Sequence, residues 1–211
     1  MLTGAALAAL LPSPLIAADA DAGQHDDVHD TVPQDIVVTA PFERSRADVL
    51  SPVTVLSGHD LAREVRSTIG DTLSRQPGVS STSFGPNASR PILRGFQGDR
   101  VRILTDGIGS FDVSTTSVDH AVVINPLLAE RIEVVRGPAA LQYGSSAIGG
   151  VVNVLDTRIP RTVPDEAVHV DAVGTYSSAS DQFYGASSVD LPVSDKVVLH
   201  VDGSYLDGDD L

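Results

Sequence analysis

The sequence contains no cysteine and no tryptophan, and its 14 lysine and arginine residues stand against 28 aspartate and glutamate residues. The absence of cysteine excludes disulfide scaffolds, thiolate zinc sites, iron–sulfur clusters and thiol catalysis. The net charge of -14 excludes a nucleic-acid-binding protein, because phosphate groups are bound by clustered lysine and arginine. The 18 glycines and 13 prolines indicate turns and strands rather than long helices.

The motifs of common enzyme classes are also missing. The sequence has no His-Glu-x-x-His motif, no phosphate-binding loop, no dinucleotide fingerprint and no complete Gly-x-Ser-x-Gly elbow. Gly144-Ser145-Ser146 comes nearest to such an elbow but lacks the closing glycine. We therefore predict that the chain is not an enzyme and requires no cofactor.

The N-terminal segment is apolar and rich in small residues. Residues 2–18 are mostly leucine and alanine, with Pro12 and Pro14 among them, and the first acidic residue is Asp19. This pattern predicts a secretory signal peptide over residues 1–20, although no lysine or arginine precedes Arg44. A short core helix is the alternative, which the two prolines would interrupt.

Residues 21–40 change to acidic residues, histidine and small residues, a composition typical of a flexible tail. Within this tail, His25 and His29 stand among aspartates and form a weak candidate tract for metal binding. A solvated tail without a specific metal is the alternative.

The end of this tail is a short island of mainly β-branched residues with no evident partner strand in the neighbouring sequence. It consists of Asp35, Ile36, Val37, Val38 and Thr39. Such a segment favours addition to the sheet edge of another protein, because its affinity comes from the main chain. An ordinary edge strand is the alternative.

The middle of the chain predicts a small mixed α/β unit. Strands are expected over Pro52–Leu56, Pro91–Phe96, Val101–Gly107, Arg131–Val135 and Val151–Leu155. A short helix is expected after Ser57 as its N-cap, and a second over Ile69–Gln76, capped by Thr68. Asp106-Gly107 is a turn signal.

Beyond Asp156 apolar and polar residues alternate over lengths of about ten residues, as in tilted membrane strands. The apolar faces are expected at alternate residues within Val168–Tyr176, Phe183–Leu191 and Val197–Tyr205, with a turn over Pro192–Asp195. An edge of a soluble β-sandwich is the alternative. Three strands cannot close a barrel, so we expect further strands after residue 211.

Taken in series, these segments resemble the plug domain of TonB-dependent outer-membrane receptors. The matching pieces are residues 35–40, Ile69-Gly70-Asp71-Thr72-Leu73 with Gln76-Pro77-Gly78-Val79, Leu93-Arg94-Gly95-Phe96 and Thr105-Asp106-Gly107-Ile108. The most specific piece runs from Arg131-Ile132-Glu133-Val134-Val135-Arg136-Gly137-Pro138 to Tyr143-Gly144 and is followed by Ala147-Ile148-Gly149-Gly150-Val151-Val152-Asn153-Val154.

The resemblance implies an α+β plug domain, a small mixed sheet with short helices, over residues 41–160. The first antiparallel strands of a truncated transmembrane β-barrel, of about 22 strands in the family, would follow at residues 161–211. It also implies a receptor surrounded by lipid in the outer membrane of a Gram-negative bacterium. That receptor would take up a scarce nutrient with energy from the TonB complex.

The same resemblance assigns roles to residues. Asp35 to Thr39 become the TonB box. Three arginines, Arg94, Arg131 and Arg136, stand in otherwise apolar strands and are expected to pair with carboxylates of the barrel wall.

The stretch around residues 119–120 gives the only indication of the transported substrate. Asp119 and His120 are adjacent residues of types that bind zinc, and this stretch resembles the zinc-uptake branch of the receptors. We therefore expect zinc, or another metal or metal chelate, as the transported ligand. A siderophore, haem or cobalamin receptor is the alternative, and so is a soluble plug-like periplasmic binding or signalling module.

Overall fold

The computed structural model describes residues 36–37, 44–45, 52–110 and 112–209. The chain divides into two compact units, residues 1–32 and residues 33–211, and all described residues belong to the second. The predicted signal peptide and the histidines of the tail, His25 and His29, lie outside the described residues.

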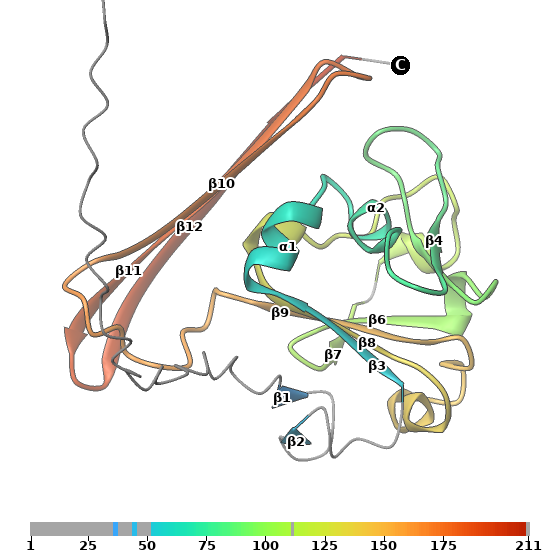
Figure 1. Cartoon of the computed structure of the whole chain (residues 1–211), viewed down its shortest axis with the longest axis horizontal. Coiled ribbons are helices and arrows are strands. Elements are labelled where there is room, and N and C mark those ends of the chain that lie inside the picture. The colour runs from blue at the N-terminus through green and yellow to red at the C-terminus, as the bar shows by residue number, and fades with distance from the viewer. Residues whose placement is uncertain (1–35, 38–43, 46–51, 111, 210–211) are drawn as a thin grey trace, which may run out of the picture. The chain divides into compact units, whose positions relative to one another are not determined.

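A five-stranded mixed sheet forms the centre of the second unit (Figure 1). Its strand order is β3-β8-β9-β6-β7. The strands are β3 (Val53–Ser57), β8 (Ala129–Val135), β9 (Gly150–Asp156), β6 (Val101–Thr105) and β7 (Ile108–Gly109). β6 and β9 are parallel, and the other neighbours are antiparallel. The sequence predicted the first four of these strands within a few residues.

Both faces of this sheet are buried. On one face Ile132, Val134, Val152 and Val154 pack with residues of the two helices, and on the other Val53, Val135 and Val151 pack with Ala140 and Ala147. Central strands buried on both faces are mainly apolar, and among the six buried residues from Gly150 to Leu155 only Asn153 has a polar side chain.

Two short helices cover the first face: α1 (Gly58–Glu64) and α2 (Ile69–Leu73). Both begin where the sequence predicted. The Thr68 hydroxyl accepts a hydrogen bond from the Asp71 amide, whereas the Ser57 side chain makes no capping bond. α2 is shorter than the predicted Ile69–Gln76, because its last turn tightens as the Gln76 amide donates to the Leu73 carbonyl.

A separate two-stranded sheet pairs β4 (Val79–Ser81) with β5 (Pro91–Leu93). The predicted strand over Pro91–Phe96 ends early, because Arg94 has a φ of 51° and turns the chain back toward Phe96. The Asp106-Gly107 turn is confirmed: both residues have positive φ, and the Gly107 amide donates to the Asn153 side chain at 2.8 Å.

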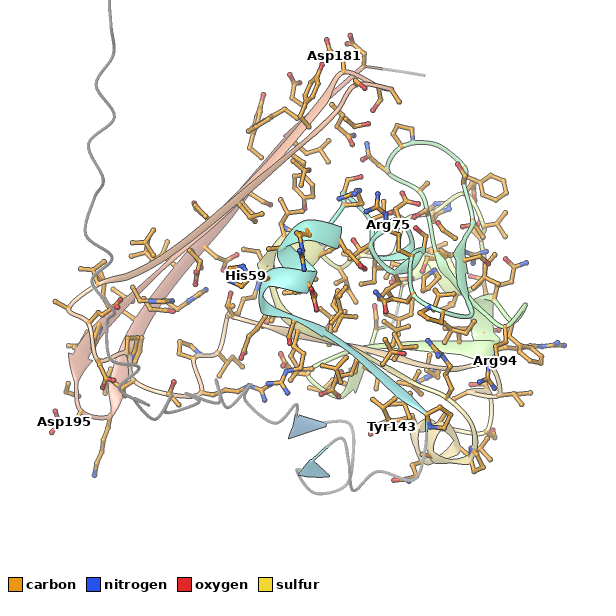
Figure 2. All side chains as sticks on the ribbon, in the orientation of Figure 1. His59, Arg75, Arg94, Tyr143, Asp181 and Asp195 are labelled. Atoms are coloured by element: carbon orange, nitrogen blue, oxygen red, sulfur yellow. The ribbon has the colours of Figure 1, made fainter. Side chains whose placement is uncertain are left out.

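Three longer strands follow in an antiparallel sheet: β10 (His169–Ser177), β11 (Gln182–Ser194) and β12 (Val197–Asp207). Figure 2 labels Asp181 and Asp195 at opposite ends of this sheet. The turn between β11 and β12 falls at Asp195-Lys196 rather than at the predicted Pro192–Asp195, because β11 continues through a bulge between Pro192 and Ser194.

The predicted apolar face of this sheet is confirmed by its register. Val170 lies opposite Val189, which lies opposite Val201, and Leu191 lies opposite Leu199. Val170, Leu199 and Val201 are more than half exposed. The other face packs on the five-stranded sheet and its helices: Tyr184 and Ala186 are buried in their core, near the 3-10 helix η4 (Pro126–Leu128). The first face therefore presents a continuous row of apolar side chains to the surroundings.

No helix among the described residues has the length and hydropathy needed to cross a membrane.

We expect the 211-residue chain to aggregate in detergent-free buffer, and a fragment that ends near Asp156 to stay monomeric. The reason is the row of exposed apolar side chains on β10–β12, because soluble monomers rarely expose large contiguous apolar patches. Analytical ultracentrifugation of both chains checks this. A monomeric, detergent-free 211-residue chain with protected amides across residues 167–206 would contradict it.

Candidate functional site

One end of the second unit is formed by two long loops and a strand turn. The loops are residues 82–90, between β4 and β5, and residues 110–124, after β7; the turn is residues 178–181, between β10 and β11. The Gln182 amide donates to the Asn87 side chain at 2.8 Å, which fixes the first loop beside the turn. We call this set of segments the loop end.

Arg90 joins the two loops. Its side chain is 4% exposed, and its guanidinium donates to the Ser114 carbonyl. Its own amide donates to the Thr82 hydroxyl at 2.9 Å, which closes the first loop on itself. A residue of the first loop therefore holds the second loop in place.

Asp112 shapes the second loop. Its carboxylate accepts hydrogen bonds from the Ser114 amide and the Ser110 hydroxyl, both at 2.9 Å, and from the Val123 amide at 3.3 Å. Burial alone would raise the pKa of Asp112, but a hydrogen bond from the Ser114 hydroxyl, followed by those from Ser110, Val123 and the Ser114 amide, outweighs it and holds the pKa below its usual value.

The predicted zinc ligands lie together at the tip of the second loop. His120 Nδ1 is 3.0 Å from Asp119 Oδ1, and the Ser117 hydroxyl donates to the same carboxylate oxygen. These hydrogen bonds, first from Ser117 and then from His120, lower the pKa of Asp119 to about 2. In the part of the chain that the structure describes, no group of three or more His, Cys, Asp or Glu side chains is placed to hold a metal ion.

The predicted TonB box is described only at Ile36 and Val37, which form β1 (Ile36–Val37). β1 pairs with β2 (Arg44–Ser45) in antiparallel fashion, with Val37 opposite Arg44. The expectation that this segment lacks a partner strand in the neighbouring sequence is therefore wrong, because Arg44–Ser45 supplies one. Asp35, Val38 and Thr39 lie outside the described residues.

The three predicted wall-pairing arginines occupy different environments. Arg131 Nη1 is 3.9 Å from Glu133 Oε1, so Arg131 has a carboxylate within the plug itself. Arg94 is exposed. Arg136 is 7% exposed, and its Nε and Nη2 atoms have no hydrogen-bond partner among the described residues. Burial, followed by repulsion from Arg94, lowers the pKa of Arg136.

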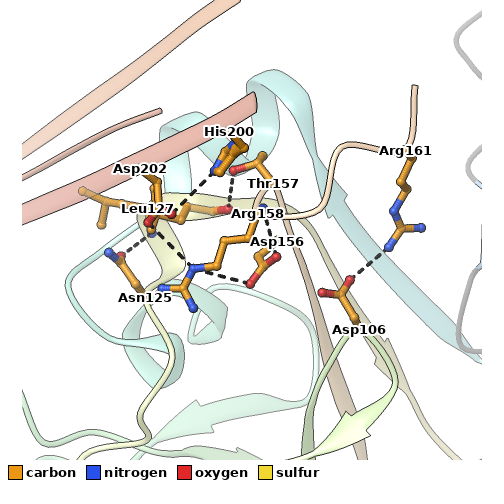
Figure 3. Close-up of polar contacts among 10 residues, drawn as sticks. Asp106, Asn125, Leu127, Asp156, Thr157, Arg158, Arg161, His200 and Asp202 are labelled. Carbon is orange, nitrogen blue, oxygen red and sulfur yellow. Dashed lines mark hydrogen bonds and ion pairs between the residues drawn. The ribbon is translucent and has the colours of Figure 1, made fainter. Parts of the chain in front are cut away.

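The sequence analysis missed a polar cluster that joins the plug to β12 (Figure 3). Arg158 Nε lies 4.0 Å from Asp156 and 3.7 Å from Asp202 on β12. His200 Nδ1 lies 2.6 Å from Asp190, in a pair that is almost fully buried. The sequence carried one signal for these residues: Asp190, His200 and Asp202 fall at the polar positions of the alternating strands.

A second ion pair holds the segment that leads into β10. Arg161 lies 3.0 Å from Asp106, at the tip of the β6–β7 turn (Figure 3). Burial, together with the nearby Asp156 carboxylate, raises the pKa of Asp106, and the Arg161 charge opposes that rise. Residues 156–161 thus make ion pairs both with the β6–β7 turn and with the sheet β10–β12, which we call the wall sheet.

Solved structures of receptors share this architecture. The siderophore receptor PirA from Acinetobacter baumannii matches with a TM-score of 0.58 and 24% identity, over 74% of this chain and 24% of that chain. A mutant of the ferric enterobactin receptor PfeA from Pseudomonas aeruginosa matches with a TM-score of 0.60 and 22% identity, over 76% of this chain and 25% of that chain. The ferric-catecholate import receptor Fiu from E. coli K12 matches with a TM-score of 0.56 and 23% identity, over 75% and 21%.

These three likenesses show the fold, and this chain spans about a quarter of the length of those receptors. All three proteins are named as siderophore-type receptors, none as an enzyme, and their names give no support to the zinc-uptake branch expected above. The family described as TonB-dependent Receptor Plug Domain matches residues 45–151, just over half of the chain. This match begins after the predicted box and ends within β9. The chain therefore belongs to the TonB-dependent receptor plug-domain family.

Proposed function

We propose that this chain is the plug and first wall strands of an outer-membrane receptor for a ferric siderophore, with uptake energised by the TonB complex. The observation that carries the proposal is the direct succession of a plug domain and an antiparallel sheet whose outer face is apolar. The siderophore receptors named above have the same fold, which favours an iron chelate as the ligand.

The wall sheet supports a membrane location. A lipid-facing strand alternates apolar and polar residues, and aromatic side chains gather where the strand reaches the interface. Tyr176 lies opposite Phe183, and both are at least half exposed at the loop end of the sheet. A soluble plug-like module, the alternative from the sequence, would expose this face to water.

Energy transfer requires a segment that the TonB partner can hold. Residues 35–39 are the proposed segment, because an extended β-branched strand can add to a sheet edge through its main chain. β1 pairs on one side with β2, and no other strand among the described residues pairs with it, so a strand of a partner can add to its other edge.

A siderophore fits the loop end better than a bare zinc ion does. Zinc in proteins is almost always held by four ligands, three of them protein side chains even in open sites. Among the described residues, Asp119 and His120 supply two, and both already bond to each other. A siderophore supplies the ligands of its own iron and needs only contacts with its surface; haem and cobalamin also carry their metal ion already bound.

The test of the proposal is growth of an iron-limited strain that has this receptor as its only uptake route for ferric chelates. We expect one or more added siderophores to restore growth, and deletion of the receptor to remove the effect. Zinc-limited growth of the same strains is the matched control. Receptor-dependent growth on zinc, with none on any iron chelate, would contradict the proposal.

A further inference from the structure

The first loop of the loop end, residues 82–90, rests on the first turn of helix α2. The hydroxyl of Ser67, which precedes the helix, donates to the Pro86 carbonyl at 3.1 Å. Near the end of the loop, the Ser89 and Thr68 hydroxyls are hydrogen-bonded to each other, and both side chains are buried. The loop is therefore attached to α2 in its middle and at its end.

One carboxylate, that of Asp71, connects both ends of this loop. The Thr68 hydroxyl donates its single hydrogen to Asp71 Oδ2 at 2.8 Å, so Ser89 is the donor in the bond between Ser89 and Thr68. The Ser81 hydroxyl, at the end of β4 where the loop begins, donates to Asp71 Oδ1 at 2.9 Å. Asp71 thus holds the start of the loop directly and its end through Thr68.

Gly70 lets the loop approach the helix closely. A β-carbon at this position would lie 2.7 Å from Ser89 Oγ and 2.8 Å from the backbone carbonyl carbon and nitrogen of Arg90, nearer than the 3.0 Å that real β-carbons keep. Gly70 is helical and has no positive φ, so it is the space, and not the backbone conformation, that requires glycine here. A larger residue would have to push the Arg90 backbone away.

The helix is a firm base, and the first loop passes its position on to the second. α2 packs in the core through Ile69 and Leu73, which are 1% and 0% exposed. On the other side of the loop, Arg90 donates to the Ser114 carbonyl of the second loop. A displacement of the Arg90 backbone therefore moves the second loop as well.

We propose that the first turn of α2 positions both loops of the loop end, with Thr68, Gly70 and Asp71 as positioning residues for siderophore binding. This inference rests on the receptor function proposed above and names residues beneath the loop surface that set its affinity. Loops that are held in place before the ligand arrives lose less conformational entropy on binding, and this preorganisation raises affinity.

The test is equilibrium binding of the ferric siderophore that restores iron-limited growth, measured on the intact receptor in isolated outer membranes. Ser89→Ala removes the donor at the loop end and leaves the Thr68–Asp71 bond in place. Gly70→Ala inserts a β-carbon against the loop, although alanine favours a helix more than glycine does. We expect each variant to weaken binding by about 10-fold, the size of one lost buried hydrogen bond.

Matched controls separate positioning from helix stability. Thr72 is also buried on α2, but among the described residues its hydroxyl bonds only to the backbone of Arg66 and Thr68. We expect Thr68→Val to weaken binding, Thr68→Ser to restore it, and Thr72→Val to leave the affinity per folded receptor unchanged. Gly203→Ala is the control for Gly70→Ala, because a β-carbon at Gly203 meets no atom within 4 Å.

A second readout needs no ligand. A spin label is placed on Phe84→Cys in the first loop or on Val123→Cys in the second, in a receptor whose only cysteine is the introduced one. Both positions are exposed, by 56% and 79%. We expect Ser89→Ala and Gly70→Ala to shift the spectra at both positions toward higher mobility, and Thr72→Val to shift neither.

The outcomes distinguish this inference from the receptor function. Wild-type affinity in Ser89→Ala and Gly70→Ala, or an equal loss in Thr68→Val and Thr72→Val, would overturn the inference and leave the receptor function standing. If no ferric siderophore restores growth, the receptor function and its affinity residues fall together, and the spectra alone report whether α2 positions the loops.

Discussion

Replacing Val37 with proline is expected to abolish energised uptake while ligand binding at the loop end stays at its wild-type level. Proline has no amide hydrogen, and its ring fixes φ, so the residue can no longer donate in a strand ladder. Val37 lies in β1, the described part of the proposed partner-binding segment. Uptake rate and equilibrium binding, measured on the same cells, check this result.

The matched control is Val37→Ala, which retains the amide hydrogen and removes only side-chain atoms. Affinity in strand addition comes mainly from the main chain, so we expect Val37→Ala to retain most of the uptake. Unchanged uptake in the proline variant would contradict the role of this segment. Equal loss in both variants would instead assign the effect to the side chain.

Replacing Arg136 with methionine is expected to destabilise the intact receptor by about 3–5 kcal/mol, the usual result when one partner of a buried ion pair is removed. Arg136 is buried, and two of its guanidinium nitrogens have no partner among the described residues. A charged group in that position needs a counter-charge once the wall surrounds it. We infer that the wall provides a carboxylate, which the substitution would leave unpaired.

In a fragment that ends near Asp156, the same substitution should not lower the free energy of unfolding. There no wall carboxylate is left behind, and an apolar side chain replaces an incompletely paired guanidinium, so stability is expected to stay equal or rise. Denaturant unfolding of the fragment and thermal unfolding of the intact receptor give the two values. Replacing the exposed Arg75 with methionine should change the stability of neither the fragment nor the intact receptor by more than about 0.5 kcal/mol.

An equal loss of stability in the fragment and in the intact receptor would contradict wall pairing. It would assign Arg136 a role within the plug, of the kind that Arg131 has with Glu133.

Much of the fold could be predicted because its signals are local. The strands of the plug end at residues whose backbone preferences are strong, such as Asp106 and Gly107, and the wall strands show the two-residue period of a sheet. The apolar faces read from that period are the ones that the register aligns.

The parts that could not be predicted depend on contacts between distant segments. β6 pairs in parallel with β9, whose partner residues lie about fifty positions further along the chain. The Arg161–Asp106 pair spans 55 positions. Pairing partners for single charges have no local sequence signal, and β7 has only two residues, too few to show a period.

The zinc expectation, which the names of the similar structures do not support, rested on too few residues for a related reason. Adjacent Asp119 and His120 have the right chemistry for zinc, but a site is defined by the third and fourth ligands, which only folding can bring near. Around this pair the described residues supply no further ligand.

The most direct test of TonB-energised siderophore uptake is accumulation of radiolabelled iron, given as a ferric siderophore that restores iron-limited growth, by cells that express the intact receptor. We compare cells with a functional TonB partner against cells that lack it, with cell-surface binding measured in parallel. We predict equal binding in both strains and accumulation only where the partner is present. Equal accumulation in the strain that lacks the partner would contradict it.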